Sequence, residues 1–296
     1  MSSVAIIGLG SMGLGMAQSL VRAGFEVTGC DVSAAARDRF KGPTAATPRE
    51  AAQGADIVVS VVVNAAQTEA VLFGAEGVID AMAANGVFIS SATMDPSIAR
   101  SLAARVETTG RLYLDAPMSG GAARAAKGEL TFMASGKPAA FAKCEAALAA
   151  MAGKIYRLGD EAGKGSAFKM VNQHLAGVHI AAASEAMAFA AKQGLPLDQV
   201  YEVITASAGN SWMFQDRMQH VLDGDYAPRS AVEIFVKDLG IVQDMARGAH
   251  YPAPIAAAAL QMFLAAASAG MGKDDDSSVA RLYAQLAGAE LPAKKS

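Results

Sequence analysis

The sequence contains very little cysteine or histidine. Its 296 residues include two cysteines, Cys30 and Cys144, which lie far apart and in unrelated contexts. Two such cysteines exclude a disulfide framework, and they do not form a zinc-binding pattern. The four histidines are too few and too unfavourably spaced to predict a metal site. A reduced, cytoplasmic compartment is the simplest interpretation.

The chain also lacks any concentration of charge of one sign. Charged residues make up 18% of it and the formal net charge is −3, so no basic surface for nucleic acid is predicted. The apolar N-terminus is interrupted by glycines and has no positive residue before Arg22, which excludes a signal peptide. The apolar stretch 254–270 is dominated by alanine and includes Gln261. That composition favours a buried or interfacial helix over a membrane span.

Apolar residues, by contrast, are abundant. They make up 52% of the sequence, which suffices for a packed core, and the length suits about two domains. In the first half, short apolar runs alternate with helical patterns. We predict six strands, at 4–7, 26–31, 55–63, 87–91, 111–115 and 130–135. The main helices between them are predicted at 12–23, 48–52, 67–72 and 96–107. This alternation predicts a mostly parallel, doubly wound sheet covered on both faces.

The second half has a different texture. Strand signals nearly vanish after about residue 158, and long alanine- and methionine-rich helical stretches follow at 167–193, 197–206 and 231–246. We therefore expect an α/β Rossmann domain over residues 1–161 and an all-helical domain over residues 162–296. Alanine-rich helices permit close packing, which fits a homodimer or homotetramer, although packing within one chain would give the same pattern.

A glycine-rich turn follows the first predicted strand and opens a helix. Its residues, Gly8-Leu9-Gly10-Ser11-Met12-Gly13, form the pattern G-x-G-x-x-G, which permits close approach of a pyrophosphate to the backbone. Asp31 ends the second strand about 20 residues on, where a carboxylate accepts hydrogen bonds from ribose and repels a 2′-phosphate. The pattern predicts NAD as cofactor. The alternative is a plain turn with Asp31 as an ordinary strand end.

A second glycine-rich segment follows the fifth predicted strand. Ser119-Gly120-Gly121 offers flexible backbone with exposed N–H groups, which suits a carboxylate ligand. A plain turn is the alternative.

Lys169 and Asn172 lie three residues apart near the start of the long helix at the predicted domain boundary, so they share a face of it. Apolar neighbours favour a lysine whose proton affinity is lowered, as a general acid/base requires. The alternative is a lysine that extends into solvent. Lys237 could reach a cofactor or pair with Asp238 on the surface, and Trp212-Met213-Phe214 is more typical of helix packing than of a ligand site.

Together these motifs resemble the β-hydroxyacid dehydrogenase family, which includes 3-hydroxyisobutyrate dehydrogenases and tartronate semialdehyde reductases. The glycine turn, the segments 115–130 and 163–172, and Lys237-Asp238 follow the order and spacing of the family over almost the whole chain. The resemblance implies an NAD-dependent oxidoreductase of a small hydroxy acid. Lys169 would be the general acid/base, Asn172 would bind the substrate, and residues 119–121 would hold its carboxylate.

The resemblance also implies a set of cofactor contacts. Thr93 would line the nicotinamide pocket and Lys237 would approach the cofactor. The full set is Gly8, Gly10, Ser11, Met12, Gly13, Asp31, Val62, Val63, Thr93 and Lys237. The chain departs from the family pattern at Val63, where many members have proline, and at Ser230, where phenylalanine is common. No metal is implied.

Several stretches resemble one branch of the family, the L-threonate dehydrogenases: 62–67, 176–180, 209–214 and 228–232. Threonate carries several hydroxyls, and each one left unpaired when buried costs about 1–3 kcal/mol. Ser230, with Asn210, Ser211 and Arg229 nearby in sequence, would suit such a substrate, which would be oxidised at C2. The alternatives are a 3-hydroxyisobutyrate dehydrogenase, a reductase of glyoxylate, succinic semialdehyde or tartronate semialdehyde, and a non-catalytic dinucleotide-binding module. The presence of Lys169 and Asn172 argues against the last.

Overall fold

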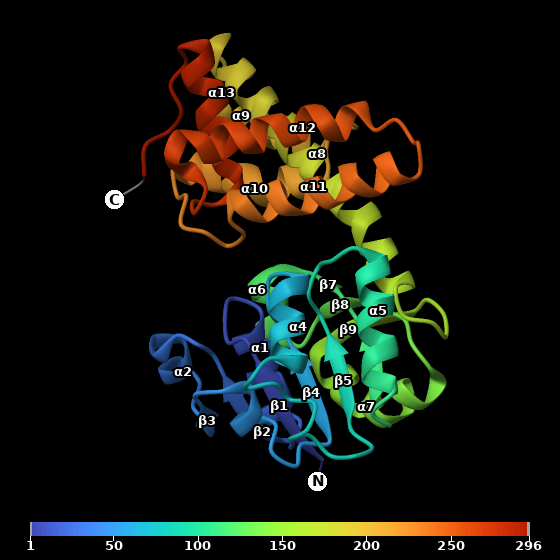
Figure 1. The fold of residues 1–296 in the computed structure, drawn as a ribbon. Helices are drawn as coiled ribbons and strands as arrows, with labels where there is room; N and C mark the ends of the chain where they lie inside the picture. The colour runs from blue at the N-terminus through green and yellow to red at the C-terminus, as the bar shows by residue number, and fades with distance from the viewer. Residues whose placement is uncertain (1, 295–296) are drawn as a thin grey trace. The chain divides into compact units, whose positions relative to one another are not determined.

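The chain divides into two compact units in a computed structural model that describes residues 2–294 (Figure 1). The first unit ends at Lys169 and the second begins at Met170. Helix α8 (Lys164–Lys192) contains this division. The boundary expected between residues 161 and 162 stays a prediction, and each unit is described by itself below.

The first unit is built on a six-stranded parallel sheet with the order β3-β2-β1-β4-β5-β6. Its strands are β1 (Ser3–Ile7), β2 (Glu26–Cys30), β3 (Thr44–Ala45), β4 (Ile57–Ser60), β5 (Val87–Ser90) and β6 (Leu112–Asp115). Ile6 of β1 pairs with Gly29 of β2 on one side and with Val59 of β4 on the other. The doubly wound Rossmann fold predicted from the alternation of strands and helices is confirmed.

Both faces of this sheet are buried, which explains why its strands are continuous apolar runs. Val4 and Ile6 of β1 pack in one core cluster with Met16 and Leu20 of α1, whereas Ile7 packs on the opposite face. The first face is covered by α1 (Gly13–Arg22), α2 (Ala34–Arg39), α6 (Gly121–Lys127) and α7 (Pro138–Met151). The second face is covered by α3 (Pro48–Ala51), α4 (Ala65–Phe73) and α5 (Pro96–Glu107).

The predicted strand at 130–135 does not belong to the main sheet, and in this respect the prediction was wrong. It forms β8 (Leu130–Ala134) of a separate three-stranded sheet, antiparallel to β7 (Met118–Ser119) and parallel to β9 (Ala152–Arg157). Periodicity identifies a strand but not its partner, since pairing depends on contacts distant in sequence. The remaining strand of the main sheet is β3, whose two residues are too few for a periodic signal.

The second unit is helical, as predicted. After α8 it contains α9 (Leu197–Thr205), α10 (Trp212–Asp223), α11 (Val232–Gly248), α12 (Pro254–Ala266) and α13 (Val279–Ala287). One of its cores centres on α11 and α12, where Phe235 stacks on Phe263 with ring centroids 5.1 Å apart. The other joins Met187 of α8 to Phe214 and Met218 of α10.

One helical stretch among the described residues, Pro254–Met271, is long and apolar enough to span a membrane by length and composition. Its inner face, with Ala256, Ala259 and Phe263, packs into the core of the second unit. The stretch is interrupted at Gly270, where φ is +88°. These contacts agree with the predicted helix that buries one face.

Candidate functional site

The predicted cofactor residues of the first unit come together at one edge of the main sheet. The turn Gly8–Gly13 follows β1, Asp31 follows β2, Val62 and Val63 follow β4, and Thr93 follows β5. The carboxyl ends of parallel strands lie at the same edge, and the strand order reverses between β1 and β4. Open α/β sheets bind ligands at such a topological switch point.

The glycines of the turn fill three different needs. Gly8 has φ +101°, and a Cβ there would lie 2.5 Å from the carbonyl oxygen of Val61. A Cβ on Gly13 would lie 1.8 Å from the carbonyl oxygen of Gly8, so the helix can start there only without a side chain. A Cβ on Gly10 would meet no described atom within 4 Å. The backbone at Gly10 is therefore open on the side where a pyrophosphate would approach.

The N-terminus of α1 is suited to an anion. Its N-cap residue, Met12, makes no side-chain capping bond, whereas the next two helices are capped by Ser33 and Thr47. The first N–H groups of an uncapped helix need an acceptor, and the helix dipole favours negative charge there. The turn and the helix start thus fit the pyrophosphate of NAD, with Gly10, Ser11 and Met12 nearest to it in sequence.

Asp31 is held in place by two backbone donors. Its carboxylate accepts hydrogen bonds of 2.8 Å from the N–H of Leu9 and of 2.8 Å from the N–H of Ser33. A carboxylate has about four acceptor positions, so Asp31 can still accept from ribose hydroxyls. Arg37 and Arg39 lie beside it, and each donates to a carbonyl, of Asp31 at 2.6 Å and of Leu9 at 3.3 Å. The return of these arginines toward the turn was not visible in the sequence.

The loops after β4 and β5 are also fixed by local bonds. The N–H of Val63 donates to the side chain of Gln67 at 2.8 Å, and Asn64 caps α4. Val62 is half-buried and Val63 is exposed. Thr93 is half-buried and precedes Asp95, which caps α5. Their contact with a cofactor stays a prediction.

Ser119, Gly120 and Gly121 form the junction between β7 and α6. Ser119 pairs with Thr131 across the small sheet. Gly120 and Gly121 have φ of +137° and +73°, which glycine adopts readily, and a Cβ on Gly121 would meet no described atom within 4 Å. Space is therefore open beside Gly121, whereas a Cβ on Gly120 would lie 3.0 Å from the side chain of Arg124. The contact of this junction with a carboxylate stays a prediction.

Lys169 and Asn172 lie on α8. Lys169 is only 7% exposed, so its side chain does not extend into solvent as the alternative interpretation supposed. Asn172 is half-buried, and its amide donates to the side-chain carbonyl of Gln173 at 2.9 Å. Burial of a lysine near a polar amide fits a general acid/base beside a substrate-binding residue.

A polar chain in the second unit links Asn172 to Lys237. The amide of Gln173 donates to the Asp238 carboxylate at 2.5 Å, and Lys237 donates to the other oxygen of that carboxylate at 2.5 Å. The predicted pair between Lys237 and Asp238 is present, but Asp238 is 1% exposed, so its placement on the surface was wrong. Gln173 was not identified from the sequence. The available signal was a polar residue on a buried helix face, one turn after Lys169.

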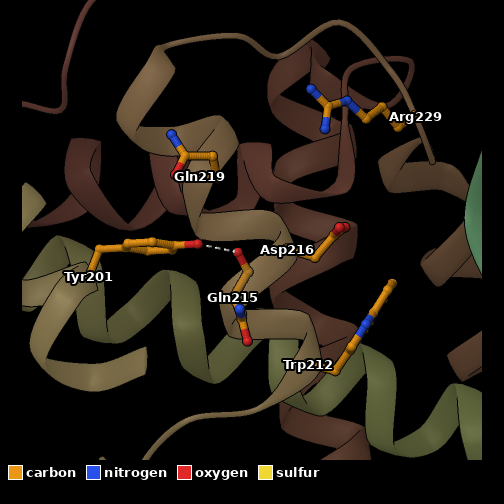
Figure 2. Close-up of a pocket in the computed structure, with 6 residues that line it drawn as sticks. All are labelled: Tyr201, Trp212, Gln215, Asp216, Gln219 and Arg229. Carbon is orange, nitrogen blue, oxygen red and sulfur yellow. Dashed lines mark hydrogen bonds between the residues drawn. The ribbon is translucent and has the colours of Figure 1, made fainter. Parts of the chain in front are cut away.

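Trp212 does not pack like the two residues after it. Met213 and Phe214 are buried, whereas Trp212 is 52% exposed and lines a pocket of about 330 Å³ within the second unit (Figure 2). The other lining residues are Tyr201, Gln215, Asp216, Gln219 and Arg229. Packing was therefore the correct interpretation for two of the three residues only.

The polar residues near Trp212 have separate local roles. Ser211 caps α10 by accepting from the N–H of Phe214 at 3.0 Å, and the Asn210 amide donates to the carbonyl of Thr205 at 3.0 Å. Arg229 lines the pocket. Their role toward a substrate stays a prediction.

Comparisons with known proteins agree with this geometry. Residues 3–159 match the family described as the NAD binding domain of 6-phosphogluconate dehydrogenase. Residues 163–283 match the family described as NAD-binding of NADP-dependent 3-hydroxyisobutyrate dehydrogenase. Among similar proteins, the L-threonate dehydrogenase of Cupriavidus necator is 53% identical over 99% of this chain and 98% of its own. That of Escherichia coli K12 is 48% identical over 99% of this chain and 97% of its own.

A solved structure is similar over nearly the same length. The 3-hydroxyisobutyrate dehydrogenase of Salmonella typhimurium is 49% identical and superposes with a TM-score of 0.91. The superposition covers 95% of this chain and 100% of that one. Proteins of similar identity thus carry two different substrate names.

Proposed function

The chain belongs to the family of NAD-dependent 3-hydroxyisobutyrate-type dehydrogenases, and from this premise we propose that it oxidises L-threonate at C2. It is therefore an oxidoreductase, for which NAD would supply the hydride acceptor when bound. The observation that carries the proposal is the buried Lys169 on the same helix as Asn172, in a chain whose cofactor residues gather at one sheet edge. A non-catalytic module would not need a buried lysine.

In the proposed mechanism the residues of the chain bind, orient and move a proton. Ser119 and the backbone of Gly120 and Gly121 hold the carboxylate of the substrate. Asn172 donates a hydrogen bond to a substrate oxygen. Lys169, in its neutral form, accepts the hydroxyl proton at Nζ as the C–H bond of the same carbon breaks and the carbonyl forms. NAD, when bound, takes up the hydride from that carbon.

The polar chain behind these residues supports the proposed roles. Gln173 holds the Asn172 amide from one side and the Asp238 carboxylate from the other. Asp238 in turn holds Lys237, which we propose approaches the cofactor. A catalytic group retains its geometry when the groups behind it are fixed.

L-threonate is favoured as substrate by the names of the relatives at 48–53% identity. The second candidate is 3-hydroxyisobutyrate, since the similar Salmonella typhimurium structure carries that name. The two substrates differ in chemistry, because threonate brings additional hydroxyls that need partners, whereas 3-hydroxyisobutyrate brings a methyl group. Reduction of a small aldehyde acid, such as tartronate semialdehyde, is the same chemistry run in reverse.

The test is a kinetic comparison of C3–C5 hydroxy acids with NAD and NADP, and of the aldehyde acids with NADH. We expect kcat/KM for L-threonate to exceed that for 3-hydroxyisobutyrate by at least about 10²-fold, because a site built for hydroxyls leaves its polar groups unpaired against a methyl group. The product is identified by mass spectrometry and NMR as the C2 ketone. Equal or better turnover of 3-hydroxyisobutyrate would overturn the substrate proposal.

The role of Lys169 is tested with Lys169→Ala and Lys169→Arg. We expect kcat to fall by roughly 10²–10⁴-fold, the usual contribution of a general acid/base, while the Kd of NAD stays within about twofold. Lys127→Ala, on a different helix, is the matched control. Full activity of Lys169→Ala would refute the role.

We further propose that the protein acts in the cytoplasm as a homodimer or homotetramer. Support comes from apolar side chains exposed on α8, among them Val171 at 64%, Leu175 at 52% and Phe189 at 64%. Light scattering coupled to gel filtration measures the mass. A monomer at micromolar concentration would exclude the oligomer.

A further inference from the structure

We propose that Asp115 is a positioning residue for the dehydrogenase reaction, because its buried carboxylate fixes the first turn of the helix that carries Lys169. The inference rests on the proposed function of Lys169. Asp115 ends β6 and is 1% exposed. It contacts neither substrate nor cofactor in our mechanism and acts through the helix alone.

Four hydrogen bonds converge on this carboxylate. One oxygen accepts from the N–H of Gly163 at 2.8 Å, the N–H of Ser166 at 2.9 Å and the hydroxyl of Ser135 at 3.3 Å. The other oxygen accepts from the hydroxyl of Ser166 at 2.7 Å. The hydroxyl of Ser135 also accepts from the N–H of Gly165 at 2.9 Å. The start of α8 is therefore held at Gly163, Gly165 and Ser166 by one acid and its serine partner.

Two glycines allow the helix to come this close. Gly163 has φ +96°, and a Cβ there would lie 2.8 Å from the carbonyl oxygen of Pro96. A Cβ on Gly165 would lie 2.2 Å from the carbonyl oxygen of Met133 and 2.9 Å from that of Asp115. The segment 163–166 thus packs against the strand ends through its backbone, which brings its N–H groups to the carboxylate.

The anchor itself is held by backbone hydrogen bonds. The N–H of Asp115 donates to the carbonyl of Ser135 at 3.0 Å, and the N–H of Ser135 donates back to the carbonyl of Asp115 at 2.8 Å. Asp115 also pairs with Ser90 in the main sheet. One residue therefore joins the main sheet, the end of β8 and the start of α8.

The anchor lies one helical turn from the catalytic lysine. Ser166, which gives Asp115 two of its four bonds, precedes Lys169 by three residues and so lies on the same helix face. A displacement of about 1 Å at a reacting group can cost about 10²-fold in rate. Loosening the first turn of α8 would therefore displace Lys169 directly.

The donors require an ionised acid. All four groups that bond to the carboxylate, from Gly163, Ser135 and Ser166, donate to it, which favours the charged form. Burial raises the pKa of the Asp115 carboxyl, and the bonds from Ser166, Gly163 and Ser135 oppose this shift. An asparagine keeps the shape but removes the charge and turns an NH₂ group toward the hydroxyl of Ser166, which must then accept, so Asp115→Asn weakens the anchor at nearly constant volume.

The experiment compares Asp115→Asn with Thr47→Ala, which removes the cap of the unrelated helix α3 in the same unit. Three quantities are measured on the full-length enzyme: kcat and KM, the primary isotope effect on kcat with L-threonate deuterated at C2, and amide exchange of the peptide 160–170. For Asp115→Asn we expect a fall in kcat of about 10²-fold, KM for NAD within twofold, a larger isotope effect, and faster exchange at 163–169. Thr47→Ala should lower Tm and leave the isotope effect unchanged.

An Asp115→Asn enzyme with wild-type kcat and isotope effect, or one whose only change is a lower Tm, overturns the proposal. If this variant does not fold, Ser166→Ala and Ser135→Ala each remove one hydroxyl from the anchor. A smaller fall in kcat with a raised isotope effect supports the proposal, and unchanged values overturn it. If wild-type enzyme does not oxidise L-threonate, the substrate proposal fails separately. The same kinetic constants and isotope effect are then measured with the best substrate of the hydroxy-acid series, deuterated at its own carbinol carbon.

Discussion

The N–H of Leu9 donates a 2.8 Å hydrogen bond to the carboxylate of Asp31. This bond joins the glycine-rich turn after β1 to the end of β2, so the acid that we propose for the ribose also shapes the loop that we propose for the pyrophosphate. We therefore expect the side chain to serve the choice of cofactor as well as the geometry of the turn.

Asp31→Ser should relax the choice between NAD and NADP. The variant loses a charged acceptor for the ribose, which contributes about 1.5–3 kcal/mol, so KM for NAD should rise roughly tenfold to hundredfold. Loss of the negative charge, with Arg37 and Arg39 close by, should lower KM for NADP. Steady-state kinetics with both cofactors measure the ratio of KM for NAD to KM for NADP. Asp38→Ser, on the exposed side of α2, is the control. An unchanged ratio would contradict the role of Asp31.

Gly10→Ala and Gly13→Ala should separate cofactor binding from folding. A Cβ at Gly10 meets no described atom, so Tm should hardly change, while the Kd of NAD should rise because the methyl occupies the approach of the pyrophosphate. At Gly13 a Cβ would lie 1.8 Å from a backbone oxygen, so this variant should lose both stability and NAD binding. Thermal unfolding and calorimetric titration with NAD provide the comparison. The separation of the two roles fails if Tm falls equally in both variants.

Arg217→Met should destabilise the second unit in a pH-dependent way. Arg217 binds the fully buried Asp276 through two bonds, of 2.6 and 3.2 Å. Burial raises the pKa of the Asp276 carboxyl to about 6, and Arg217 opposes that rise. Removing one partner of a buried ion pair costs about 3–5 kcal/mol when the other partner remains charged.

The sign of the pH effect follows from this pKa. In the folded state the pKa of Asp276 lies above its ordinary value of 3.8. Between about pH 4 and 6 the folded state therefore holds a proton that the unfolded state has lost. The contribution of Asp276 to stability is therefore full below pH 4 and lost as pH rises through 6. The deficit of Arg217→Met should be largest at pH 8 and smaller at pH 5, where Asp276 is protonated. Urea unfolding at both values measures it, and equal deficits would contradict the argument.

The two thiols should be inert in the folded enzyme. Burial raises the pKa of Cys30 to about 11 and that of Cys144 to about 12. At pH 8 the reactive thiolate is therefore scarcer than in an unfolded chain, where the pKa is about 8.5. Iodoacetamide should label neither cysteine in the native enzyme and both in urea, as mass spectrometry would show. Because both folded pKa values are raised, the contribution of these thiols to stability should be full below about pH 9 and be lost as pH rises through about 11 to 12. Rapid labelling without denaturant would contradict the prediction.

The sequence predicted the local features of the fold well. The run of apolar residues at β1, the glycine turn and the helix Pro96–Glu107 follow from patterns within a few residues of one another. The same patterns could not assign β8 to the small sheet, because Leu130–Ala134 has the alternation of any half-buried strand. Its partners, β7 and β9, are set by contacts across the chain.

The site divides in the same way. Its glycines, Asp31 and Lys169 could be predicted because motif spacing encodes the backbone of the turn and the face of a helix. The burial of Asp238 and its bond to Gln173 were missed, since these residues lie 65 positions apart. The four bonds at Asp115 were missed for the same reason.

The sequence by itself determined which segments become strands and helices, where the backbone must be glycine, and which side chains can do the chemistry. Only the tertiary structure decided which of these side chains lose water and which donors they meet. Periodicity and turn chemistry act over a few neighbouring residues, whereas burial and hydrogen-bond pairing depend on groups that the fold brings together from distant parts of the chain.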